Sequence, residues 1–260
     1  MPALKIGIAI ASLRQPFAKA LFTAASLGAT AVEIDARTDL KPAELSQTGL
    51  RQLRKMLDDR GLRVSAIAYP TRRGYQIAEQ LEARVAGTKE AMKLAYALGT
   101  SVVVNQVGRV PAESSGEEWN LLVEALTDLG RFGQHTGAQL AAQTGTESGA
   151  DLARLIAALP AASIGVDLDP GSLLANDFSP IEAVEALGPH VVHVHATDGV
   201  RDLARGRGLE VPLGRGSADY PAILSRLEES GYRGWFTIFR RAAADPVAEI
   251  GAAVQYLQSL

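Results

Sequence analysis

Six times along this chain of 260 residues, a segment with helical periodicity ends near a glycine, and a short apolar run begins within a few residues. A glycine fits the position just beyond a helix, where a left-handed backbone favours a residue without Cβ. The six glycines are Gly28, Gly61, Gly99, Gly137, Gly188 and Gly231. In a seventh interval, Pro160 takes the role of helix stop. The repetition predicts helices that alternate with short strands.

The apolar runs predict eight strands. They are Lys5–Ile10, Ala31–Ile34, Val64–Ile67, Ser101–Asn105, Gln139–Gln143, Ile164–Asp169, Val191–His195 and Trp235–Phe239, and a final helix is expected over Asp245–Leu260. The strands are apolar on both faces, as parallel strands covered by helices are. Eight strand-then-helix units predict the α/β class and a single (β/α)8 TIM barrel, with residues 1–260 as one domain. An open parallel sheet is the rival, but the segment IGIAIASLRQPF lacks the GxGxxG fingerprint.

Composition narrows the function classes. The net charge is −3 and the basic residues are scattered, which argues against a nucleic-acid surface. The absence of cysteine excludes disulfides and thiolate metal ligands. Neither a signal peptide nor a membrane-spanning run is expected, so a cytoplasmic location and no membrane partner are predicted. A homo-oligomer is left open.

In a barrel of this kind, reacting groups project from the carboxyl ends of the strands. Asp167 and Asp169 alternate on one strand, and His193 and His195 alternate on the next. Residues two apart share a face, so Asp169 and His195 could hold one divalent cation. Two alternatives stay open. Asp169 could cap the segment that follows it, and an HxH pair on a buried strand is more often a pair of hydrogen-bonded core histidines.

Other strand tips carry less specific signals. Gln143 ends the fifth strand, and Glu147 follows four residues later. Glu33 ends the second strand region and could line a pocket or pair with an arginine. Phe239 ends the eighth strand, where it could cover the barrel mouth, stack on the apolar face of a sugar or only fill space. Asp198 is expected in a loop turn.

Several segments in order carry a family resemblance: VEIDAR, AIAYPTRRGY, AMKLAYALGTSVVVNQVGRVP, VDLDPGSLL, VVHVHATDGVRD, VPLGRGSADYPAIL and GYRGWFTIF. With them the chain resembles, essentially end to end, the xylose-isomerase-like TIM barrels of the sugar isomerase and epimerase type. The resemblance implies a four-ligand metal centre made by a glutamate, an aspartate, a histidine and a second glutamate. The aspartate and histidine fall on Asp169 and His195, whereas the two glutamates fall on Gln143 and Phe239.

These two replacements bear on the chemistry that the resemblance implies. In the family mechanism the metal binds two sugar oxygens, and a flanking glutamate exchanges a proton as general acid–base. A glutamine cannot take up that proton, and a phenylalanine can neither bind a cation nor transfer a proton. The resemblance therefore implies a degraded centre, with manganese, magnesium or zinc weakly bound or absent and isomerase activity weak or lost. Glu147, Asp198 or Glu33 could supply a substitute carboxylate.

The alternative is a barrel that binds a sugar phosphate or sugar acid without converting it. Arginines follow several strands, among them Arg72, Arg201 and Arg241, and guanidinium groups favour phosphate and carboxylate. Surface ion pairs are an equally simple explanation of these arginines. The resemblance also suggests Ser172 and Arg201 beside the substrate, where some relatives have a histidine and an arginine. Repair of nucleic acid, as in the endonuclease branch, is disfavoured by the few histidines.

Overall fold

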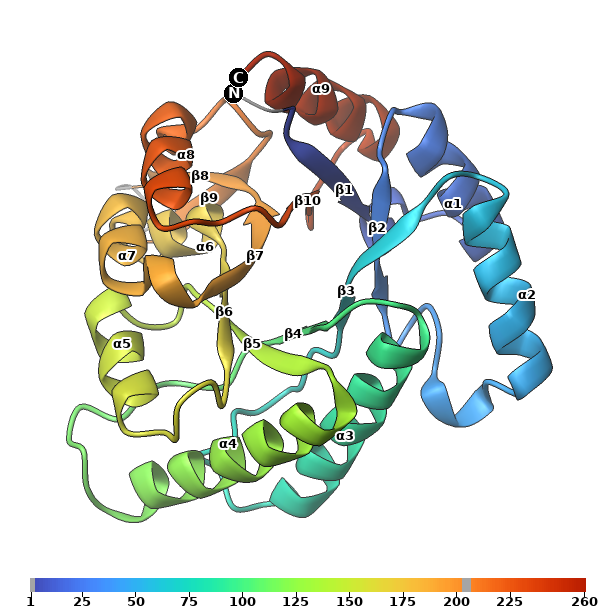
Figure 1. Cartoon of the computed structure of the whole chain (residues 1–260). Helices are drawn as coiled ribbons and strands as arrows, with labels where there is room; N and C mark the ends of the chain where they lie inside the picture. Colours follow the sequence, from blue (N-terminus) through green and yellow to red (C-terminus); the bar gives the residue numbers. More distant parts are fainter. Residues whose placement is uncertain (1–2, 203–206) are drawn as a thin grey trace.

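A computed structural model describes residues 3–202 and 207–260. Eight parallel strands close into a barrel in the order β1-β10-β7-β6-β5-β4-β3-β2 (Figure 1). They are β1 (Lys5–Ala9), β2 (Ala31–Asp35), β3 (Arg63–Ala68), β4 (Val102–Asn105), β5 (Gln139–Gln143), β6 (Gly165–Leu168), β7 (Val191–Ala196) and β10 (Trp235–Ile238). All eight predicted strands are confirmed to within two residues at either end, and the fold is the predicted (β/α)8 barrel.

Helices surround the strands (Figure 1). They are α1 (Phe17–Ser26), α2 (Gln47–Asp58), α3 (Leu81–Ala97), α4 (Glu117–Thr136), α5 (Gly149–Ala157), α6 (Pro170–Ala175), α7 (Pro180–Leu187), α8 (Tyr220–Glu229) and α9 (Pro246–Gln258), with short 3-10 turns η1 (Ile10–Leu13), η2 (Pro42–Glu44) and η3 (Gly188–His190). Many begin at a residue whose side chain accepts a backbone N–H of the first turn, such as Ser148 and Asp245. Within 3–202 and 207–260, no helix has the length and apolarity needed to cross a bilayer.

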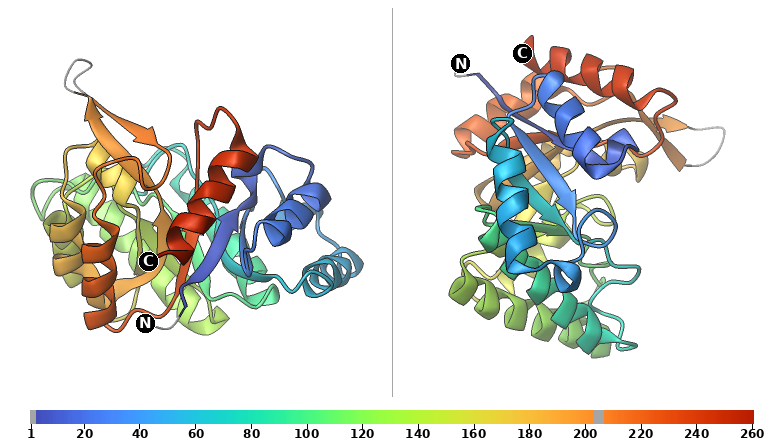
Figure 2. Two further views of the ribbon diagram at one scale, coloured as in Figure 1. Left: turned by 90° about the horizontal axis from the view of Figure 1, so that it is seen from above. Right: turned by 90° about the vertical axis from the view of Figure 1, so that its right-hand side faces the viewer.

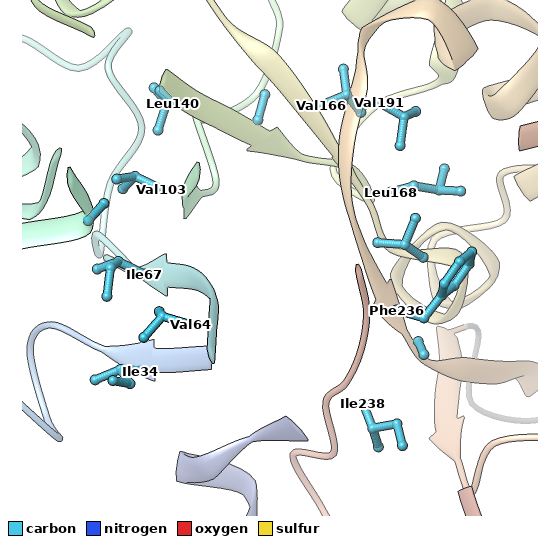
Figure 3. Close-up of a cluster of buried hydrophobic side chains, with 14 of the residues drawn as sticks. Ile34, Val64, Ile67, Val103, Leu140, Val166, Leu168, Val191, Phe236 and Ile238 are labelled. Carbon is cyan, nitrogen blue, oxygen red and sulfur yellow. The ribbon is translucent and has the colours of Figure 1, made fainter. Parts of the chain in front are cut away.

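The strands supply much of the apolar core. Side chains such as Ile34, Ile67, Leu140 and Val166 belong to one large buried cluster (Figure 3). A second set of strand side chains is polar although it is buried: Ser65, Asp167, His193 and Thr237 are each at most 2% exposed. Buried polar groups are stable only when they are hydrogen-bonded. These four side chains are hydrogen-bonded to one another.

The glycine rule holds at five of the six positions. Gly28, Gly61, Gly99, Gly137 and Gly231 have φ between 63° and 92°. The prediction is wrong for Gly188, where φ is −44°. That glycine is needed for space, because a Cβ there would lie 2.2 Å from Ser230 Oγ.

Asp198 is not in a loop turn as expected, because the connection after β7 contains two antiparallel strands, β8 (Asp198–Asp202) and β9 (Arg207–Val211), and Asp198 begins the first of them. They project beyond the barrel, at the end opposite the N-terminus (Figure 2). The Asp198 carboxylate anchors this segment by accepting the backbone N–H groups of Gly199, Gly214, Gly216 and Ala218 at 2.8–3.0 Å. Asp198 is 1% exposed, so it organises the connection and does not face an open site.

Asp198→Asn should destabilise the protein by about 3 kcal/mol or more, because hydrogen bonds to a charged group contribute about 1.5–3 kcal/mol each and an amide nitrogen cannot accept an N–H. Urea unfolding measures the difference. Asp219→Asn is the matched control. Asp219 accepts the Ala222 N–H at the start of α8, and asparagine caps a helix as well as aspartate does. Equal losses in the two variants would contradict the anchoring role of Asp198.

Candidate functional site

A cavity of about 240 Å³ opens at the carboxyl ends of the strands. Its polar lining comes from strand tips and the loops behind them: Glu33, Asp35, Thr71, Asn105, Gln106, Gln143, His195 and Arg241. Phe239, directly after β10, supplies an aromatic wall. The structure therefore brings Glu33, Gln143, His195 and Phe239 together, although they lie on four different strands or strand ends.

His195 is held between two carboxylates. Its Nε2 lies 2.9 Å from Glu33 Oε2, and its Nδ1 lies 2.5 Å from Asp167 Oδ2. Carboxylates accept hydrogen bonds, so both ring nitrogens act as donors and the ring is an imidazolium. Burial by itself lowers the pKa of His195, but the charges of Asp167 and Glu33 outweigh it and hold that pKa well above its usual range. Glu33 thus pairs with a histidine, not with an arginine.

Asp167 joins the two histidines. Its Oδ1 lies 2.8 Å from His193 Nδ1, and His193 Nε2 lies 2.8 Å from Thr237 Oγ1. The Thr237 hydroxyl continues to Ser65 Oγ at 3.0 Å. Burial by itself raises the pKa of Asp167, but the two imidazole rings hold it well below its usual range. His193 therefore has the geometry of a hydrogen-bonded core histidine.

Asp169 lies just beyond β6 and caps α6. Its Oδ1 accepts the Ser172 N–H at 2.9 Å and the Thr197 hydroxyl at 2.5 Å. Its Oδ2 accepts the Ser172 hydroxyl at 2.7 Å and the Gln143 amide Nε2 at 2.9 Å. Each carboxylate oxygen has two lone pairs, so the carboxylate is fully hydrogen-bonded. This geometry matches the capping alternative.

These contacts test whether the residues suit a divalent cation. Glu33, His193 and His195 bring atoms of ligand type within 4.8 Å of one another, but both nitrogens of each histidine are already hydrogen-bonded. A histidine binds a metal through a free lone pair, and Asp169 has no vacant acceptor position. Gln143 and Phe239 supply no charge. The residues present therefore do not fit a four-ligand metal centre.

Phe239 occupies the position that the resemblance assigns to a glutamate. Its ring centroid is 5.3 Å from that of His195. The Arg241 guanidinium lies near the same ring, with Cζ 5.6 Å from the centroid. The ring thus connects the buried imidazolium with the cation at the cavity mouth, and both contacts are favourable for an aromatic quadrupole.

The remaining predicted residues lie away from the cavity lining. Arg72 is exposed, and Arg201 forms an exposed ion pair with Asp177 at 2.9 Å. Ser172 contacts Asp169 as described above. Glu147 is 5% exposed, accepts a hydrogen bond from Thr146, and is not among the described residues that line the cavity.

Sequence reasoning missed several residues of the site. Asp35 and Asn105 line the cavity, and a polar residue at the end of an apolar strand was the signal that could have found both. Asp167 was paired with Asp169 on one face, but the contact between Asp167 and both histidines was not foreseen. That contact depends on the register between β6 and β7, in which Asp167 lies beside His193.

Comparisons with known proteins agree with this architecture. A family model described as the xylose isomerase-like TIM barrel matches residues 21–260. Inosose dehydratase of Bacillus thuringiensis (strain Al Hakam) is 27% identical over 148 residues, which cover 50% of this chain and 49% of that protein. The chain thus spans about half the length of the curated relatives it matches.

Two solved structures cover nearly the whole chain. A xylose isomerase domain protein from Planctomyces limnophilus is 25% identical, with a TM-score of 0.86 over 99% of this chain and 97% of that one. D-allulose 3-epimerase from Methylomonas sp., in complex with D-allulose, is 18% identical, with a TM-score of 0.75 over 99% and 97% of the two chains. At that identity the second similarity concerns the fold alone.

The buried Glu147 generates a pH prediction. Burial raises the pKa of its carboxyl to about 7, so the folded protein binds this proton more tightly than the unfolded chain does. The free energy of unfolding therefore falls by about 3 kcal/mol in total as pH rises from about 4.5 to 7, because the folded protein must release the Glu147 proton over this range. Glu147→Gln should abolish this loss and be more stable than the original protein at pH 8. Urea unfolding at pH 5 and pH 8 measures it.

The matched control is Glu124→Gln, because Glu124 lies on α4 and is exposed. This variant should keep the pH dependence of the original protein. If Glu147→Gln keeps it too, the buried carboxyl is not the group responsible.

Proposed function

Because the chain belongs to the xylose isomerase-like TIM barrel family, we propose that it binds a small acidic carbohydrate at the barrel mouth, without the metal-dependent isomerisation of its family. The observation that carries the proposal is the polar cavity at the carboxyl ends of the strands, which Gln143 and Phe239 line at the positions where the resemblance implies proton-transferring glutamates. The ligand class is a sugar acid or a sugar phosphate.

The cavity lining suits a polyol. Glu33, Asp35, Asn105 and Gln143 offer carboxylate and amide groups, which are the partners that sugar hydroxyls need. The Phe239 ring offers a surface for the apolar face of a sugar. Ligand sites commonly combine such an apolar wall with a few directed polar groups. The D-allulose complex of one structural neighbour is in keeping with a carbohydrate ligand.

Arg241 is the residue that leads us to propose an acidic group on the ligand. Its backbone is fixed on both sides, because its N–H donates to Glu210 Oε1 at 2.9 Å and its carbonyl accepts from Arg14 at 2.7 Å. Its guanidinium Cζ lies 5.6 Å from the centroid of the Phe239 ring, and the nearby carboxylates of Glu210 and Glu249 form their ion pairs with the neighbouring Arg240. A guanidinium that lines a polar cavity favours a carboxylate or phosphate.

Titration calorimetry with gluconate, glucose 6-phosphate and glucose tests the proposal. At least one of the two anions should bind, and Arg241→Gln should weaken that binding by about tenfold or more, since hydrogen bonds to charged groups contribute about 1.5–3 kcal/mol. Arg72→Gln is the control, because Arg72 is an exposed arginine of another loop outside the cavity lining. The absence of binding across a wider panel of sugar acids and phosphates would refute the proposal.

One observation favours a second candidate, a metal-independent enzyme that transfers protons. Glu33 and the His195 imidazolium contact each other at 2.9 Å, and both line the cavity. Such a pair offers an acceptor and a donor of protons in one place. In this candidate Glu33 takes a proton from a carbon beside a carbonyl group, and His195, whose two N–H groups donate to Glu33 and Asp167, holds the Glu33 carboxylate in place.

Deuterium exchange decides between the two candidates. A bound ketose or keto acid incubated in D2O with EDTA should lose a C–H signal in the proton NMR spectrum if the second candidate holds. Glu33→Gln should then slow the exchange by about 10²-fold or more, the range of a general base. Binding without exchange supports the first candidate alone.

A further inference from the structure

We infer that the side-chain amide of Gln143 stands where a cation between Asp169 and His195 would lie, and that it keeps the barrel free of metal there. The inference deepens the proposed function, because it concerns the same cavity. Metal binding tests the inference, whereas sugar binding tests the proposed function, so the inference and the proposed function can fail separately.

Gln143 is the last residue of β5 and lies between the two residues in question. Its Nε2 is 2.9 Å from Asp169 Oδ2 and 3.4 Å from His195 Nδ1. In the described part of the chain, no hydrogen bond joins Asp169 directly to His195. The amide nitrogen is therefore the group that separates the carboxylate from the imidazole.

The orientation of the amide follows from its neighbour. Asp169 can only accept hydrogen bonds, so the NH2 group must face it, and the opposite orientation would place two oxygens in contact. Both protons of a side-chain amide are donors, and one of them is used here. A cation at this point would meet an N–H group instead of a lone pair, and it would have to displace the amide.

Asp169 also has little need of a cation. The carboxylate is 1% exposed, and a buried charge needs strong compensation. Ser172, through its backbone and its hydroxyl, Thr197 and Gln143 supply four donors. These bonds hold the ionised carboxylate through neutral partners. A glutamate at position 143 could donate nothing to Asp169 and would instead oppose it with a second negative charge, which a cation relieves.

The test is a titration with Mn²⁺, followed by electron paramagnetic resonance of the free ion and by thermal melting. The original protein should show no saturable binding at millimolar Mn²⁺. Gln143→Glu combined with Phe239→Glu should bind Mn²⁺ at least about tenfold more tightly, the scale on which groups around a metal site change its affinity. It should also melt at a higher temperature with Mn²⁺ than with EDTA.

The control is Gln106→Glu combined with Phe239→Glu. Gln106 lines the same cavity, so this variant adds the same charge and leaves the Gln143 amide in place. It should show no comparable gain. An equal gain would mean that charge alone attracts the ion, and saturable binding by the original protein would mean that the amide does not exclude it. Either result overturns the inference.

Circular dichroism in EDTA shows whether the variants fold. If a carboxylate at position 143 opposite Asp169 prevents folding, the variant Gln143→Ala combined with Phe239→Glu is used instead of Gln143→Glu combined with Phe239→Glu. It removes the amide without placing a second negative charge beside Asp169. It should bind Mn²⁺ more tightly than Phe239→Glu alone. Equal affinities for these two variants would also overturn the inference.

Discussion

The Asp167 carboxylate, shared by two imidazole rings, is the interaction on which the site depends. It is fully buried, and an unpaired charge at such a place would cost several kcal/mol. His193 and His195 compensate it from the neighbouring strand, and Glu33 meets the far side of His195 from across the barrel. Because three charged groups and a second imidazole satisfy one another, the ring of His195 has one orientation, and the Glu33–His195 pair is presented to the cavity as a unit.

Asp167 and Asp169 are two residues apart, but their carboxylates are stabilised by different kinds of group because of where each residue lies. Asp167 lies within β6, where its hydrogen-bond partners are the His193 and His195 side chains of β7. Asp169 lies one residue past the strand, where the chain turns into α6 and the backbone N–H of Ser172 becomes available. The first carboxylate is therefore balanced by an imidazolium and the second by neutral donors. The hydrogen-bond acceptors of both carboxylates are thus satisfied by groups of the barrel itself.

The fold was predictable from the chain because its signals are local. Apolar runs of four to six residues and glycines after helices are properties of neighbouring residues, and they placed all eight barrel strands. Gly188 shows where local reasoning ends, since its reason is Ser230, 42 positions later (230 − 188), and not its own φ. The β8–β9 segment shows the same limit. Its strands carry glycines and arginines and not an apolar alternation, and Asp198 holds its base through backbone groups up to 20 residues away.

The order of residues alone fixes which chemical groups stand at the carboxyl ends of the strands, and hence that Gln143 and Phe239 cannot exchange a proton or balance a cation's charge. How the remaining groups pair depends on the folded barrel. A hydrogen bond forms or fails within a few tenths of an ångström, and that distance depends on strand register and barrel closure. Glu33 and His195, 162 positions apart, meet at 2.9 Å for that reason, and for the same reason the Gln143 amide lies between Asp169 and His195.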